Sequence, residues 1–212
     1  MNLPNKITLT RIGLSLVIIL LLLFPFDATG ITLPTLFINE SIVVDIRYFV
    51  CGCLFLIASL TDFIDGYLAR KKNQVTDFGK MMDAIADKVL VDSVLIILSS
   101  TGFISAVIAV VVIARDIVVD SIKMIAGSKG VVVAAIKSGK LKTIFLMIGI
   151  TLTLFYNLPF ELLNLKVSDA FLIVAAVLSI ISAIQYYNLN KQYISMQSEN
   201  VENVESVEKI DI

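Results

Sequence analysis

The chain has 212 residues, of which 58% are hydrophobic, and its mean hydropathy of +0.92 excludes an ordinary soluble domain, which is about 45–50% apolar. Its net charge of −1 argues against the strongly basic surface of a nucleic-acid-binding protein, so no nucleic-acid partner is expected. The complete absence of histidine excludes histidine-based acid–base, nucleophilic and metal sites, so any bound metal must have oxygen ligands, which suit Mg²⁺ or Mn²⁺.

Six hydrophobic segments follow one another along the chain, each close to the ~20 residues that a membrane-spanning helix needs. They cover residues 7–25, 42–61, 81–100, 103–126, 141–157 and 168–187. These segments predict an all-α integral membrane protein with six transmembrane helices, surrounded by the lipid bilayer. We expect the six-helix domain to occupy residues 1–190 and an acidic, polar C-terminal tail to occupy residues 191–212. The tail has no glycine or proline and could form a frayed helix, but its composition favours a solvated or disordered end.

The placement of lysine and arginine predicts the orientation of the segments, because cytoplasmic loops carry an excess of both. Cations gather before the first segment and after the second and fourth: Lys6, Arg11, Arg70, Lys71, Lys72, Lys129, Lys137, Lys140 and Lys142. The three remaining connections contain only two lysines or arginines, Arg47 and Lys166. The sequence therefore predicts a multi-pass protein of the cell membrane with both termini in the cytoplasm.

Four aspartates lie where the second segment ends and the third begins. Asp62 and Asp65 are three residues apart, and Asp83 and Asp87 are four apart, so each pair shares one face of its helix. Two carboxylates ~4 Å apart repel by about 4 kcal/mol at an effective dielectric near 20, so four of them need compensating cations. Two divalent ions, Mg²⁺ or Mn²⁺, would neutralise the charges and form a clamp for displacement at phosphorus. We expect this active site at the cytoplasmic edge of the membrane.

Glycine and arginine extend the aspartate pattern. Glycine inside a helix costs about 1 kcal/mol, so Gly66 and Gly79 indicate close approach by a ligand or a neighbouring helix. Arg70 is suited to a phosphate or a nucleotide. The complete pattern resembles the signature of the CDP-alcohol phosphatidyltransferase family: Asp62-x2-Asp65-Gly66-x2-Ala69-Arg70-x8-Gly79-x3-Asp83-x3-Asp87.

This resemblance implies a six-helix membrane enzyme, a homodimer, that uses two divalent ions to displace CMP from a CDP-linked lipid with an alcohol. The metal-site residues that it implies are Asp62, Asp65, Asp83 and Asp87. It implies that Asp87 is also the catalytic general base. The residues that it implies for the CDP-lipid pocket are Asp62, Gly66, Arg70 and Gly79.

The acceptor alcohol has to be inferred from residues outside this signature. The opening Leu3–Arg11 resembles the Pro-Asn-x2-Thr-x2-Arg start of the bacterial branch of the family that makes phosphatidylglycerophosphate, which implies that Asn5 and Thr8 also contact the CDP-lipid. The stretches Ala114–Asp116 and Gly139–Thr143 resemble the same branch. The chain departs from it at Asp116, where glutamate is usual, and at Lys123, where arginine is expected.

An acceptor that carries a phosphate needs cations, and the fourth and fifth segments supply a basic patch expected at the depth of the aspartates. Its members are Arg115, Lys137, Lys140 and Lys142. Together with the resemblance, the patch implies a reaction that joins CDP-diacylglycerol and sn-glycerol 3-phosphate to give phosphatidylglycerophosphate and CMP. Inositol phosphate, serine or phosphatidylglycerol as the acceptor is an alternative, and a divalent-cation transporter is another, because acidic residues in spans can mark an ion path.

Overall fold

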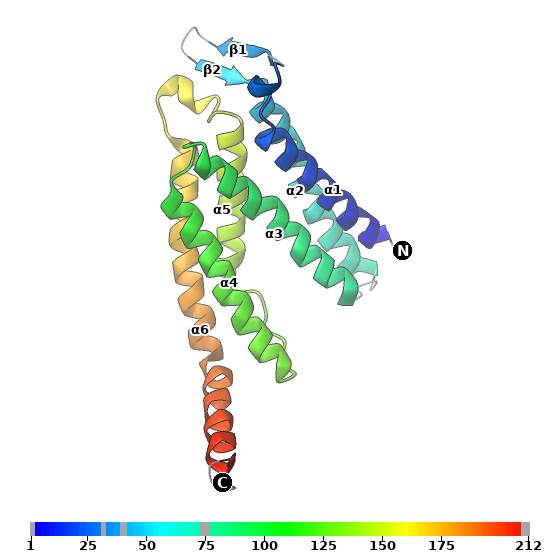
Figure 1. The fold of residues 1–212 in the computed structure, drawn as a ribbon, viewed down its shortest axis with the longest axis vertical. Coiled ribbons are helices and arrows are strands. Elements are labelled where there is room, and N and C mark those ends of the chain that lie inside the picture. Colours follow the sequence, from blue (N-terminus) through cyan, green and yellow to red (C-terminus); the bar gives the residue numbers. More distant parts are fainter. Residues whose placement is uncertain (1–2, 31–32, 39–41, 73–76, 209–212) are drawn as a thin grey trace. The chain divides into compact units, whose positions relative to one another are not determined.

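The computed structural model describes the backbone of residues 3–30, 33–38, 42–72 and 77–208. It describes the side chains of these residues except 3–7, 27, 36, 38, 42, 62–72, 77, 78, 80 and 194–208. This part of the chain contains six α-helices: α1 (Leu3–Leu23), α2 (Ile46–Lys72), α3 (Asp77–Ser100), α4 (Ala106–Ser128), α5 (Lys137–Leu154) and α6 (Val167–Glu208) (Figure 1). Two short 3₁₀ helices, η1 (Asp27–Thr29) and η2 (Phe160–Leu163), lie in connections. The expectation of six helices is confirmed for the described residues.

A short antiparallel hairpin between α1 and α2 corrects the all-α expectation. Strand β1 (Thr35–Ile38) pairs with β2 (Ile42–Asp45), with Thr35 opposite Asp45. On β2, Val44 is buried and Val43 is exposed, which is the alternation expected of a half-buried strand. The backbone N–H of Asp45 donates to the Tyr156 hydroxyl at 3.1 Å, which joins the hairpin to the segment that follows α5.

Helix α6 continues through the acidic segment as far as Glu208, where a solvated or disordered tail was expected. Residues 191–208 contain neither glycine nor proline, the two residues that most oppose a helix. Nothing in their sequence therefore ends the helix at the last apolar turn, although the residues beyond it are mostly polar, with acidic residues from Glu199 onward. The final residues, 209–212, lie outside the described part.

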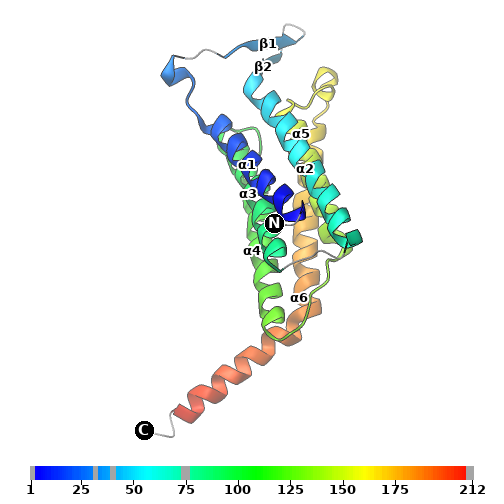
Figure 2. The same ribbon diagram turned by 90° about the vertical axis from the view of Figure 1, so that its right-hand side faces the viewer.

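The chain forms two compact units, residues 1–109 with 146–172, and residues 110–145 with 173–212. In the first unit α1 packs against both α2 and α3, and Figure 2 shows α1 beside α3. Fully buried apolar side chains such as Ile18 and Phe55 form its core. Gly52 permits close packing on α2, because an added Cβ would lie 3.1 Å from the Phe155 ring.

The second unit has its own core around Tyr186 of α6. The buried side chains of Val119 and Ile122 on α4 pack with Tyr186, and Val133 and Ile136 of the α4–α5 connection lie against them. The Tyr186 hydroxyl accepts a hydrogen bond from the backbone N–H of Ile136 at 3.3 Å. Tyr186 therefore holds the connection next to the residue at which α5 begins.

One helical stretch among the described residues, Val167–Tyr193, is long and apolar enough to cross a membrane. Two shorter apolar stretches, Thr8–Leu23 and Ile46–Thr61, lie in α1 and α2. Predicted site residues lie near the charged ends of three helices: the end of α2, the start of α3 and the start of α5.

Candidate active site

Helix α3 positions two of the four predicted metal-site aspartates. Asp83 and Asp87 are one turn apart on α3 and therefore share a face. The Asp83 side chain is 50% exposed, whereas Asp87 is partly buried. Asp62 and Asp65 belong to α2, but their side chains lie outside the described residues. The side chains that the structure describes contain no group of three or more potential metal ligands, and this search did not include Asp62 and Asp65.

A buried arginine on α1 holds the Asp83 carboxylate. Arg11 Nη1 donates to Asp83 Oδ1 at 2.8 Å, and the Arg11 side chain is 0% exposed. A charge within an apolar helix is expected to find an opposite charge, and Asp83 supplies it here. Ser15, one turn further along α1, donates to the Arg11 carbonyl oxygen at 2.8 Å. The packing of α1 on α3 therefore sets the orientation of one predicted metal ligand.

The two described carboxylates fit a hard divalent cation. Arg11 engages Oδ1 of Asp83, and no hydrogen bond to Oδ2 is found among the described residues. Half of the Asp83 side chain remains accessible, and carboxylate oxygens are the ligands that Mg²⁺ and Mn²⁺ prefer. Asp87, on the next turn, adds a second carboxylate on the same face.

The residues predicted to contact the CDP-lipid lie on the same three helices. Thr8 is buried on α1, one turn before Arg11, and Gly79 lies on α3, one turn before Asp83. Asn5 on α1, with Gly66 and Arg70 on α2, have described backbones, but their side chains lie outside the described residues. Thr8 and Gly79 are thus brought to the helix turns next to the Arg11–Asp83 pair.

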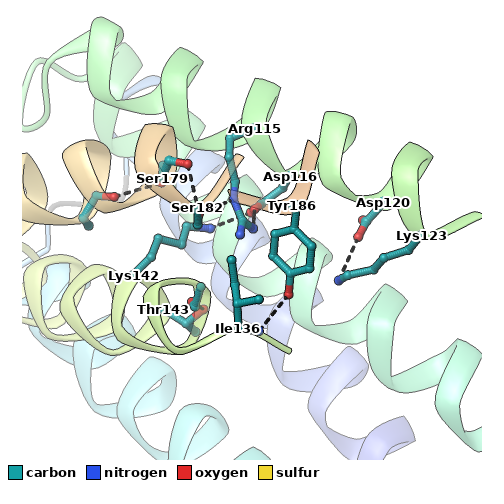
Figure 3. A network of polar contacts seen from close by, with 12 residues as sticks. Arg115, Asp116, Asp120, Lys123, Ile136, Lys142, Thr143, Ser179, Ser182 and Tyr186 are labelled. Carbon is teal, nitrogen blue, oxygen red and sulfur yellow. Dashed lines mark hydrogen bonds and ion pairs between the residues drawn. The ribbon is translucent and has the colours of Figure 1, made fainter. Parts of the chain in front are cut away.

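In the second unit, two predicted acceptor-binding cations share one carboxylate (Figure 3). Arg115 Nη1 lies 2.7 Å from Asp116 Oδ1, and Lys142 Nζ lies 2.7 Å from Asp116 Oδ2. The Lys142 side chain is only 4% exposed, and that of Arg115 is 11% exposed. Asp116 therefore compensates two nearly enclosed charges and fixes their separation.

Helix α6 also contacts the Arg115 guanidinium, in addition to Asp116 of α4. Arg115 Nε donates to Ser182 Oγ at 2.9 Å, and the guanidinium carbon lies 5.5 Å from the Tyr186 ring centroid, within the range of a cation–π contact. A Cβ on Gly139 would lie 3.2 Å from Arg115 Nη2, so the glycine leaves this nitrogen room beside the first turn of α5. The guanidinium is consequently held in one orientation.

The other two predicted acceptor-binding lysines flank that first turn. Lys137 begins α5, Lys140 follows one turn later, and both are exposed. The backbone N–H groups at the start of a helix have no partner within it and favour an anion. One small region of the second unit therefore contains exposed lysines, a helix N-terminus and an oriented guanidinium. This arrangement is suited to a phosphate.

Four residues of these two sites have roles that the sequence does not predict: Arg11, Asp116, Ser182 and Tyr186. The sequence marks Arg11 as a cytoplasmic cation and a motif residue, and a charge inside an apolar segment also signals a buried partner. Ser182 and Tyr186 carry no such signal, because an isolated serine or tyrosine in an apolar helix is ordinary.

Comparison with known proteins gives a match along most of the chain. The sequence profile described as CDP-alcohol phosphatidyltransferase matches residues 1–181. A Bacillus subtilis (strain 168) protein named CDP-diacylglycerol–glycerol-3-phosphate 3-phosphatidyltransferase is 41% identical over 189 residues, covering 89% of this chain and 95% of the relative. A Rickettsia typhi protein of the same name is 34% identical over 193 residues, covering 91% of this chain and 98% of the relative.

The chain belongs to the CDP-alcohol phosphatidyltransferase family. Both the profile match and the identity to relatives over most of their length establish this membership, and they confirm the resemblance inferred from the aspartate signature. The family is generally dependent on divalent metal ions, which agrees with the carboxylates of α3. Membership, together with the apolar stretch Val167–Tyr193, indicates a membrane protein.

Proposed function

We propose that this chain transfers the phosphatidyl group of CDP-diacylglycerol to sn-glycerol 3-phosphate, giving phosphatidylglycerophosphate and CMP. The observation that carries the proposal is the 41% identity, over 89% of the chain, to a relative named for this reaction. Further proteins with the same name, including one from Rickettsia prowazekii at 34% identity, support it. The basic residues around Arg115 agree with an acceptor that carries a phosphate.

On the donor side, the proposal assigns two divalent cations, Mg²⁺ or Mn²⁺, to Asp62, Asp65, Asp83 and Asp87. Bound there, the cations would neutralise charge on the pyrophosphate of the donor. Asn5, Thr8, Gly66, Arg70 and Gly79, with Asp62, would bind the CDP-lipid. The Arg11–Asp83 pair at 2.8 Å supports this assignment, because it orients one of the carboxylates.

The chemical step is an in-line displacement at the phosphorus that carries diacylglycerol. Asp87 accepts the proton of the glycerol 3-phosphate hydroxyl, the hydroxyl oxygen forms the new P–O bond, and the P–O bond to CMP breaks. CMP leaves with the electron pair of that bond. Asp87 suits the role of base because it lies one turn beyond Asp83 on the same face of α3.

On the acceptor side, the proposal assigns the phosphate of glycerol 3-phosphate to Arg115, Lys137, Lys140 and Lys142. Arg115 is oriented by Asp116, Ser182 and Tyr186, which reduces the conformational freedom it would lose on binding. Lys142, nearly enclosed, acts beside Asp116, whereas Lys137 and Lys140 are exposed and reach toward solvent. An uncharged acceptor such as free inositol would leave these cations without an anionic ligand.

Replacing Lys140 with alanine is expected to raise the KM for glycerol 3-phosphate about tenfold, the lower end for a hydrogen bond to a charged group, because Lys140 is exposed. The KM for CDP-diacylglycerol should change little. Steady-state kinetics with each substrate varied would measure both. Lys166→Ala, which removes an exposed lysine of the other unit, is the matched control and should change neither value. An unchanged acceptor KM in Lys140→Ala would remove the physical support for a phosphorylated acceptor.

The proposed reaction is tested directly with purified protein, CDP-diacylglycerol and a panel of acceptors. The panel contains glycerol 3-phosphate, inositol phosphate, serine and phosphatidylglycerol, and both the lipid product and the released CMP are measured. We expect phosphatidylglycerophosphate with glycerol 3-phosphate, and no CMP release when divalent ions are chelated. A different lipid product would reassign the acceptor within the family, and metal transport without CMP release would favour a cation transporter.

We further propose that all six helices cross the cell membrane, with both termini in the cytoplasm, and that the protein is a homodimer. In a variant lacking Cys51 and Cys53, single cysteines replacing Asn39 or Asn164 should react with an impermeant maleimide added to intact cells. Cysteines replacing Asn73 or Lys191 should react only after the cells are opened. Labelling of position 73 from outside would reverse the orientation and place the aspartates on the other side of the membrane.

A further inference from the structure

The connection between α4 and α5 exposes apolar side chains between two exposed lysines. Val132 is 94% exposed, and it stands in the run Val131–Ala135, between Lys129 and Lys137. Among the described residues, the backbone groups of Val132–Ala135 take part in no hydrogen bond. Exposed apolar side chains such as Val132 favour an apolar phase, whereas open backbone groups need water or polar headgroups. The interface between lipid headgroups and acyl chains meets both requirements.

The same connection borders a groove against α6. The groove has a volume of about 260 Å³, and it is lined by residues 131–136 and by Tyr186, Leu189, Asn190 and Tyr193. These α6 residues form the last two turns of Val167–Tyr193, the stretch long and apolar enough to cross a membrane. Tyrosines at the end of such a stretch are typical of the headgroup level. With this stretch spanning the bilayer, as proposed above, the groove would lie at the depth where a phospholipid changes from headgroup to acyl chain.

The Lys129 ammonium lies next to this groove. The Lys129 ammonium donates to the backbone carbonyl oxygen of Tyr193, one of the lining residues, while Lys129 itself is exposed. An ammonium has three donors, so two remain for a ligand. Among bilayer lipids, an anionic headgroup complements this charge, whereas a zwitterionic headgroup carries a cation of its own.

We propose that the groove between residues 131–136 and the end of the apolar stretch of α6 is a binding site for an anionic phospholipid of the surrounding bilayer. The acyl chain lies against the valines and Leu189, and the phosphate lies beside Lys129. This lipid is a bound neighbour and takes no part in the transfer reaction. The proposal rests on the membrane location of the chain and is independent of which reaction the chain catalyses.

Tryptophan fluorescence can test the site, because the chain contains no tryptophan. Val132→Trp places a single reporter at a side chain that is 94% exposed and therefore tolerates enlargement. The variant is reconstituted in phosphatidylcholine bilayers containing a small fraction of brominated phosphatidylglycerol or brominated phosphatidylcholine. We expect blue-shifted emission and stronger quenching by the anionic lipid, which corresponds to about fivefold preferential binding for one lysine near a lipid surface.

Three further variants make the result specific. In the Val132→Trp background, Lys129→Gln should abolish the preference for the anionic lipid. Lys166→Gln, which changes an exposed lysine of the other unit, should leave the preference near fivefold. Gln197→Trp, in the acidic segment, provides the emission of a reporter outside the groove.

Three results would overturn the proposal. Equal quenching by the two brominated lipids would exclude a site for anionic lipid, and emission like that of Gln197→Trp without quenching would place the valines in water. Blue-shifted emission that neither lipid quenches would mean that protein, such as a second copy of the chain, covers the groove. None of these measurements depends on turnover, so their failure is distinguishable from failure of the proposed reaction.

Discussion

The Asp87→Asn protein is expected to turn over about 10²–10⁴-fold more slowly than the unchanged enzyme, the usual cost of removing a general base. Asparagine keeps the size of the side chain and one acceptor oxygen, but it loses the negative charge and the basic electron pair. Because Asp83 remains one turn away on α3, CDP-diacylglycerol should still bind in the presence of Mg²⁺ or Mn²⁺. Single-turnover CMP release and equilibrium binding of the CDP-lipid would measure the two effects separately.

The controls for this experiment distinguish a base from a metal ligand. Asp62→Asn and Asp65→Asn should weaken metal-dependent binding of the CDP-lipid as well as turnover. Asp120→Asn, which removes a carboxylate from a half-exposed pair with Lys123 at 3.5 Å, should change neither quantity. Near-normal turnover by Asp87→Asn would reject the base assignment. Loss of metal-dependent lipid binding in that variant would make Asp87 chiefly a metal ligand.

The helices could be predicted from the sequence because each overlaps one of six hydrophobic segments of about 20 residues. The hairpin at Thr35–Asp45 escaped prediction, since two strands of four residues carry too short an alternation to stand out. The sequence did not favour the extension of α6 to Glu208 for a different reason. Acidic composition indicates contact with water, but it does not by itself decide whether the backbone is helical.

The sequence indicates which residues make up each candidate site, but it does not indicate the contacts between helices that hold these residues in place. The aspartates of α2 and α3 are separated by a short connection and carry a recognisable spacing. The arrangement around Asp116 joins residues 26 positions apart in the pair with Lys142, and 67 positions apart in the bond from Arg115 to Ser182. Helical periodicity carries no information over such separations. Packing between helices determines these contacts, so they emerged only from the structure.

The second large effect is expected in stability, at the Arg11–Asp83 pair. Breaking a buried ion pair costs about 3–5 kcal/mol, and we expect Asp83→Ala to approach the lower figure because the Asp83 side chain is 50% exposed. Arg11→Met should cost less, since it replaces an enclosed charge with an apolar chain and leaves an aspartate that water can reach. The Arg11→Met/Asp83→Ala protein should therefore be more stable than Asp83→Ala alone.

A double-mutant cycle measured by unfolding in detergent with a chelator present would give the coupling between these two residues, expected at about 1–3 kcal/mol. The half-exposed pair of Lys123 and Asp120 provides a reference cycle, with coupling below about 1 kcal/mol. Repeating the unfolding with Mn²⁺ separates ion pairing from metal binding, because a ligand at 100 times its Kd stabilises the folded state by about 2.7 kcal/mol. Arg11→Met should keep most of this gain, whereas Asp83→Ala should lose it because a ligating carboxylate is gone. If Asp83→Ala retains the full gain, Asp83 is only the partner of Arg11, and the cation must be held without it.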